Sequence, residues 1–146
     1  MSDWYAHVTV ATVIEQDGRF LLVEERSDEG CVFNQPAGHL EPGESIIAAA
    51  ERETLEETGY RVALDGLLGT SLYTSDANGV TYYRTCFHGH VLERDLAASL
   101  DPAIIAVHWL DEAEIRARSD RMRSPLVLAS VERYLSGQRW PLDVIY

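Results

Sequence analysis

The sequence predicts an α/β (α+β) fold, in which a mixed β-sheet is flanked by a few helices, and three observations carry this prediction. Short segments rich in Val, Ile, Thr and aromatic residues recur along the chain. One Ala-rich segment without Pro or Gly has the composition of a helix. Gly-containing turns separate these segments. The 146 residues are 46% hydrophobic, enough for one core, so we expect a single domain over residues 1–146.

The first third of the chain predicts a β-hairpin followed by an irregular region. Residues 7–14 and 19–24 are apolar and rich in β-branched side chains, and the segment 15–18 between them ends in glycine. Residues 32–36 predict a short extended piece that ends at a proline. A loop is expected over residues 38–43, which include two Gly and one Pro.

The Ala-rich segment 45–58 predicts a helix that Gly59 ends, because glycine adopts the left-handed conformation common after a last helical turn. The later elements alternate strand-like and helical patterns in the same way. In chain order they are a strand-like segment 60–72 with turns at 65–66 and 69, a hairpin joining 67–74 to 80–92 through 76–79, a strand at 104–110, a short helix to 117 capped by Asp111, and a final helix from Pro125 to Ser136 capped by Ser124.

Charge and composition argue against several classes of protein. The net charge is −12 and the isoelectric point about 4.7, whereas proteins that bind nucleic-acid polymers normally carry a basic face. No apolar run approaches the roughly 18 residues of a membrane helix, and the N-terminus has no leader pattern. Cys31 and Cys86 have neither metal-site nor disulfide spacing, so we expect both thiols to be reduced. We therefore expect a cytoplasmic protein that does not bind a membrane.

The predicted helix 45–58 carries an unusual stripe. Steps of three and four residues join apolar side chains to two carboxylates on one face: Ile46, Ala49, Ala50, Glu53 and Glu57. Glu56 lies about 60° around the helix from Glu53. Like charges at this spacing repel, and acids near a helix C-terminus oppose its dipole, so a divalent cation such as Mg²⁺ would compensate. A solvated, Glu-rich helix face is the alternative, and both interpretations stay open on this argument alone.

The segment 38–60, GHLEPGESIIAAAERETLEETGY, resembles the signature of the Nudix hydrolases. That signature is Gly-x5-Glu-x7-Arg-Glu-U-x-Glu-Glu-x-Gly-U, where U is a bulky aliphatic or aromatic residue. A chance match in such a chain is on the order of one in a million. The one departure is Thr54 at the first U position, which we expect to affect packing more than chemistry. The invariant positions are all filled, by Gly38, Glu44, Arg52, Glu53, Glu56, Glu57 and Gly59.

The resemblance implies a Nudix-type α/β/α sandwich and metal-dependent hydrolysis of phosphoanhydride bonds, with Mg²⁺ as cofactor and Mn²⁺ as an option. It implies that Glu53, Glu56 and Glu57, with the Gly38 carbonyl, bind the metal. Arg52 would orient these carboxylates and pair with Glu44. A carboxylate would also act on the attacking water. We favour Glu56 for that role over the other candidate acids, Glu57, Glu24, Asp76 and Glu112.

Strings outside the signature resemble a subfamily of bacterial Nudix phosphatases over about residues 7–143: HVTVA at 7–11, NQPAGHLE at 34–41, RSPLV at 123–127 and SGQRWPL at 136–142. This resemblance implies release of phosphate from nucleoside tri- and diphosphates and from thiamine-type pyrophosphates. An ADP-ribose or dinucleoside polyphosphate pyrophosphatase is one alternative, and a catalytically silent nucleotide sensor is another. An acidic calcium module lacks its Asp-rich loop here. Either a monomer or a homodimer is compatible with the sequence.

Five residues are candidates for substrate binding by their chemistry. Phe33 and Tyr73 offer aromatic faces on which a base or pyrimidine ring can stack. Gln35, with Asn34 beside it, can hydrogen-bond a ring edge, although either amide can instead satisfy strand backbone. Arg26 is placed to reach a terminal phosphate, and His39 lies in the loop before the helix. For each of these residues a purely structural role is the competing interpretation.

Overall fold

The computed structural model describes residues 3–146 as a seven-stranded mixed sheet with helices on both sides. Strand order is β3-β2-β1-β6-β5, while β4 adds to β1 and β7 adds to β2. The elements are β1 (His7–Gln16), β2 (Arg19–Ser27), β3 (Gly30–Asn34), β4 (Ala37–His39), α1 (Ile46–Thr58), β5 (Tyr60–Thr74), β6 (Thr81–Arg94), β7 (Ile104–Leu110), α2 (Glu112–Ala117), η1 (Ser119–Arg121), α3 (Pro125–Leu135) and η2 (Leu142–Val144).

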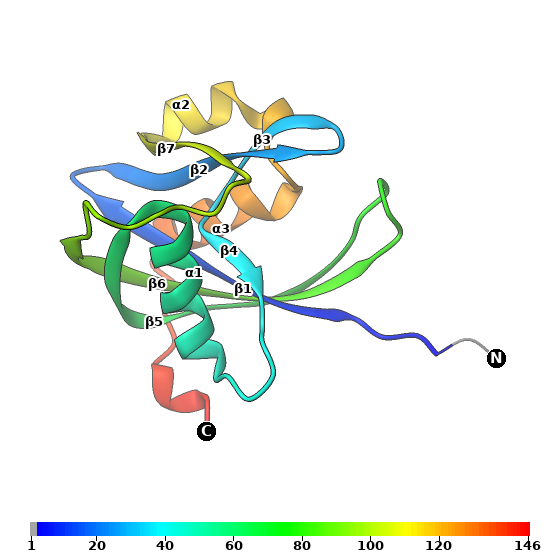
Figure 1. Ribbon diagram of the computed structural model, residues 1–146. Helices are drawn as coiled ribbons and strands as arrows, with labels where there is room; N and C mark the ends of the chain where they lie inside the picture. The colour runs from blue at the N-terminus through cyan, green and yellow to red at the C-terminus, as the bar shows by residue number, and fades with distance from the viewer. Residues whose placement is uncertain (1–2) are drawn as a thin grey trace.

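Strand β1 lies in the middle of the sheet and pairs with different strands along its length. It runs parallel to β6 from His7 to Ile14, antiparallel to β4 near its start, and antiparallel to β2 only at its last two residues. Six consecutive residues of β1 are buried, as expected for a strand covered on both faces. Figure 1 shows α1 in front of this sheet and α3 behind it.

Two apolar layers hold the helices against the sheet, which confirms the predicted α/β/α arrangement. Ala49 and Ala50 of α1 pack on one face with Val10 and Phe87. The other face packs against α2 and α3 through a larger cluster that is almost wholly withdrawn from solvent. Its members are Ala11, Val13, Phe20, Leu22, Phe33, Leu68, Cys86, Leu110, Ile115, Val127 and Val131.

Most predicted elements are present, and the corrections lie in the irregular regions. Residues 38 and 39, expected in a loop, belong to β4, because the edge of β1 offers backbone groups that need partners. The extended piece expected at 32–36 is β3, which ends at Asn34. The turns expected within 60–72 are bulges in one continuous strand, β5, where its pairing with β6 slips by a residue. Across residues 3–146 no helix is long and apolar enough to cross a membrane.

Candidate active site

The carboxyl-terminal half of α1 presents the acidic residues of the site. Ser45 caps the helix by accepting the Ala48 N–H at 3.0 Å, and Gly59 ends it at a φ of 78°. Thr54 is fully buried and donates to the Ala50 carbonyl at 2.8 Å. With its small residues fixed against the sheet, the helix turns Glu57 inward and leaves Glu56 exposed.

Arg52 connects this helix to the preceding loop. Its Nε and Nη2 donate to the two carboxylate oxygens of Glu44 at 2.6 and 2.9 Å, so the contact that the sequence predicted is present as a two-pronged ion pair. Its Nη1 lies 2.9 Å from Glu53 and 3.1 Å from Glu56. Nη2 also donates to the His39 carbonyl at 3.2 Å. Arg52 therefore holds three carboxylates and the end of β4 in one arrangement.

Glu57 and Glu53 are carboxyl groups whose ionisation burial disfavours. Glu57 is 6% exposed and accepts one backbone N–H, from Ala37 at 2.8 Å. Burial raises the pKa of Glu57 to about 9. Burial also raises the pKa of Glu53, although Arg52 opposes the shift. A Cβ on Gly38 would lie 2.1 Å from Cδ of Glu53, so a larger residue at this position would displace the Glu53 carboxylate from its present place.

The chemistry of these residues fits a hard divalent cation. Their donors are carboxylate oxygens, two of them desolvated, and such ligands suit Mg²⁺ or Mn²⁺. In the part of the chain that the structure describes, no three Asp, Glu, His or Cys side chains are already gathered as a metal site. The reason is visible in the contacts, because Glu56 turns to Arg52 and Glu57 to the Ala37 N–H.

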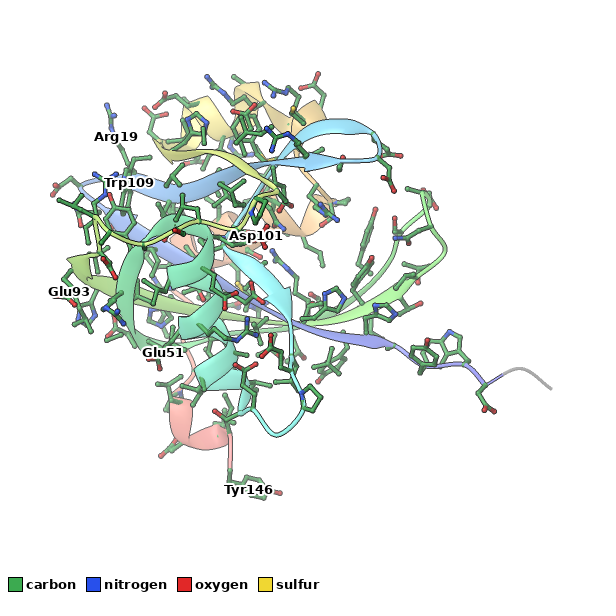
Figure 2. All side chains as sticks on the ribbon, in the orientation of Figure 1. Arg19, Glu51, Glu93, Asp101, Trp109 and Tyr146 are labelled. Carbon is green, nitrogen blue, oxygen red and sulfur yellow. The ribbon has the colours of Figure 1, made fainter. Side chains whose placement is uncertain are left out.

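A cavity of about 560 Å³ opens beside this end of α1. Figure 2 shows Asp101 near the carboxyl end of α1, where its N–H donates to the Glu56 carbonyl at 2.9 Å. Acidic, basic and aromatic side chains all contribute to the lining. The residues that bear on its chemistry are Gly38, Glu25, Glu53, Glu57, Asp101, Arg84, Arg123, Asn34, His39, Tyr73 and Tyr82.

The sheet register shows how these groups follow one another. His39 of β4, Thr9 of β1 and Arg84 of β6 are paired across three neighbouring strands, so their side chains share one face. Two residues before Arg84, Tyr82 lies on the same face and is paired with Tyr73 of β5. The cavity thus runs from the carboxylates of α1, past a guanidinium, to a pair of tyrosines.

Three of the predicted substrate-binding residues lie outside the cavity. Phe33 is 2% exposed and packs in the core with Arg121 over its ring, so it offers no free face for stacking. Gln35 is 1% exposed and uses its amide to contact Arg84 and the Val127 carbonyl. Arg26 points to the surface and donates to the Pro102 carbonyl. The substrate role expected for these three side chains is therefore corrected to a structural one.

The other predicted residues are placed close to the chemistry. His39 and Tyr73 line the cavity with Gly38, Glu53 and Glu57. Glu44, Arg52 and Glu56 stand behind this lining in the Arg52 network. The alternative acids Glu24, Glu112 and Asp76 do not line the cavity. Glu24 contacts His108 and Arg121, and Glu112 contacts Arg116.

Residues that the sequence argument did not select also line the cavity, among them Glu25, Arg84, Asp101 and Tyr82. Glu25 is 8% exposed and pairs with Arg123 at 3.0 Å, yet burial still raises its pKa. The sequence contains a feature that could have identified Arg84 as a candidate site residue, because it is a lone charge in the middle of a strand-like segment. The others belong to segments distant in sequence, and folding alone brings them to α1.

Comparisons with known proteins agree with this geometry. A family model described as NUDIX domain matches residues 5–129. Phosphatase NudJ of Escherichia coli strain K12 is 37% identical over 139 residues, covering 95% of this chain and 90% of that protein. Phosphatase NudJ of Shigella boydii is 36% identical with the same coverage. A solved structure, a NUDIX hydrolase from Nitrosomonas europaea, is 47% identical and covers 97% of both chains with a TM-score of 0.95.

Proposed function

The chain belongs to the Nudix hydrolase family, whose members act on pyrophosphate bonds, and from this premise we propose that it is a Mg²⁺-dependent phosphatase of nucleotides. Its substrates in this proposal are nucleoside tri- and diphosphates and thiamine-type pyrophosphates, from which it releases inorganic phosphate. The observation that carries the proposal is the pair of desolvated carboxylates, Glu53 and Glu57, facing a cavity that also holds a guanidinium and two tyrosines. The similarity to proteins named phosphatase NudJ supports the choice of substrates.

In this mechanism each residue of the site has a defined task. Glu53, Glu56, Glu57 and the Gly38 carbonyl would hold the divalent cation, which when bound would supply neutralisation of phosphate charge and activation of water. Arg52 positions the carboxylates through the contacts described above and fixes Glu44 beneath them. Tyr73 and Tyr82 offer rings to the base or pyrimidine of the substrate.

Glu56 accepts the proton of the attacking water in this proposal, as the sequence favoured. Glu25 is the second candidate, because it lines the cavity whereas Glu56 faces Arg52. The single-turnover rates of Glu56→Gln and Glu25→Gln, measured at saturating Mg²⁺, distinguish the two assignments. The base variant loses about 100-fold or more in rate. Equal, small losses in both variants would exclude both carboxylates.

Phosphate release is the direct test of the proposed function. The panel is GTP, GDP, thiamine pyrophosphate and ADP-ribose with Mg²⁺, for the wild type beside Glu57→Gln. We expect free phosphate from the first three compounds and its loss in the variant. Activity confined to ADP-ribose, with AMP as product, would keep the family and overturn the substrate class. Binding of nucleotides without turnover of any compound would favour a silent sensor.

A further inference from the structure

Arg84 is a buried cation without an anionic partner. Its side chain belongs to β6, is 7% exposed, and still lines the cavity. The structure gives it three hydrogen bonds, all to neutral oxygens: Nη1 to Ser130 Oγ at 2.9 Å, and Nη2 to Gln35 Oε1 at 2.8 Å and Asn34 Oδ1 at 3.2 Å. Within residues 3–146 it makes no ion pair, whereas the second cavity arginine, Arg123, is paired with Glu25.

This arrangement is costly for the ligand-free protein. A guanidinium removed from water without a counter-ion carries a large desolvation penalty. Burial lowers the pKa of Arg84, yet arginine stays charged at any physiological pH. A neutral amide could donate to two of the three acceptors without that penalty. The retained charge therefore indicates that an anion completes the site.

Position makes a phosphate group the fitting anion. Arg84 is paired across Thr9 with His39, the neighbour of Gly38, so it lies two strands from the glycine that faces Glu53. At about 4.8 Å per strand its Cα is roughly 10 Å from that edge. The three bonds fix the guanidinium plane and leave the Nε–H and one Nη1–H of its five N–H groups unused. These two N–H groups point in different directions, and each can donate to a phosphate oxygen.

We propose that Arg84 is the phosphate anchor of this cavity, binding a phosphate group of the substrate on the side away from the α1 carboxylates. The inference rests on the proposed function for the identity of the substrate, but anion binding by Arg84 does not depend on turnover. In the bound state the anchor and the carboxylate end hold the phosphate chain at two points. The anchor thereby positions the pyrophosphate bond, and Arg84 acts as a binding and positioning residue.

The experiment compares the wild type with Arg84→Gln, Arg84→Lys and a control, Arg94→Gln. Arg94 lies at the end of the same strand and is exposed, so its variant changes the net charge equally. Binding of inorganic phosphate and of GDP is measured calorimetrically with chelator present. We expect Arg84→Gln to weaken both by about 10- to 100-fold, Arg84→Lys to weaken them less, and Arg94→Gln to leave them unchanged.

A purely structural Arg84 gives a different pattern. Arg84→Gln would then lower Tm while phosphate and GDP bind as in the wild type, and that result overturns the proposal, as does a wild type that binds neither probe. Should the variants not fold, ¹⁵N-arginine-labelled wild type is titrated with phosphate. The Arg84 Nε–H resonance shifts if the proposal holds and stays fixed if it fails. Loss of phosphate binding in Arg84→Gln without hydrolysis by the wild type would defeat the proposed function alone.

Discussion

At the scale of single residues, the site is built from charges that the fold does not satisfy by itself. Glu57 has one backbone donor, and Arg84 has three neutral acceptors. Among the described residues 3–146, neither side chain has an oppositely charged partner. The two residues line one cavity, one suited to a cation and the other to an anion. A desolvated carboxyl and a buried guanidinium in one cavity are expected of a site for a metal-bound phosphate.

The variant Glu57→Gln tests whether the buried carboxyl of Glu57 destabilises the metal-free protein. The raised pKa of Glu57, about 9, means that its ionised form disfavours folding. The contribution of Glu57 to folding stability is most favourable below the pKa that it has in the unfolded chain. This contribution is lost as the pH rises through the pKa that it has in the folded protein. At pH 8 with a chelator present, the free energy of unfolding of the variant is therefore expected to exceed that of the wild type by about 1–3 kcal/mol.

Urea unfolding of the two proteins, with and without Mg²⁺, measures this effect. The wild type gains stability when Mg²⁺ is added, because a ligand of the folded state alone stabilises it. The variant gains little, since one ligand is missing. At about pH 4.5 the difference in chelator shrinks, because the wild-type carboxyl is then protonated in the folded state and about half protonated in the unfolded state, where its pKa has the ordinary value of 4.5. A variant less stable than the wild type at pH 8 would contradict this account of Glu57.

At the scale of elements, β6 gives its two faces different roles. Tyr82 and Arg84 point into the cavity, and Tyr83 between them is 42% exposed on the opposite face. The Tyr82 hydroxyl accepts a hydrogen bond from Asn78 at 3.0 Å, which helps to fix the ring. The β5–β6 hairpin that carries these residues extends away from the rest of the sheet (Figure 1). The strand alternation therefore supplies a matched pair of tyrosines for a test.

Tyr82→Ala is expected to raise KM for GDP and thiamine pyrophosphate by about 10-fold, because a stacked ring contributes roughly 1–3 kcal/mol per base. Tyr83→Ala, on the other face, serves as the control and leaves KM unchanged. Inorganic pyrophosphate has no ring, so its inhibition constant stays the same in both variants. If the two substitutions change KM equally, the ring of the substrate does not bind at Tyr82.

At the scale of the whole molecule, the same core that joins the layers also decides which residues reach the site. Phe33 belongs to the cluster between the sheet and α3, and Gln35 links β6 to α3 through Arg84 and Val127. Both were attractive as substrate contacts because aromatic and amide side chains suit a base. Their burial shows that they support the cavity wall from behind.

Phe33→Ala tests this assignment. Removing a buried aromatic ring is expected to lower the free energy of unfolding by about 3–5 kcal/mol. Phe33→Leu, which fills part of the space, costs less. Below its unfolding transition each variant keeps a KM for GDP close to that of the wild type, as steady-state kinetics at low temperature can show. A raised KM with unchanged stability would return Phe33 to the binding site.

The sequence by itself determined the elements and the acidic half of the site. Local periodicity, caps and glycine positions are properties of neighbouring residues, so helices and most strands could be located before the structure was known. The signature from Gly38 to Gly59 is likewise contiguous, and its Arg52–Glu44 contact spans only eight residues. The bulges of β5 and the short strand β4 were missed, because both depend on pairing with strands elsewhere in the chain.

Only the tertiary structure decided the other half of the cavity. Glu25, Arg84 and Asp101 come from β2, β6 and the segment before β7, and no local pattern indicates that they meet. The same applies to burial, since a residue type cannot tell whether its side chain faces the cavity, as Tyr73 does, or the core, as Phe33 does. Contacts within one helix or loop are encoded locally, whereas contacts across the sheet depend on strand order and register.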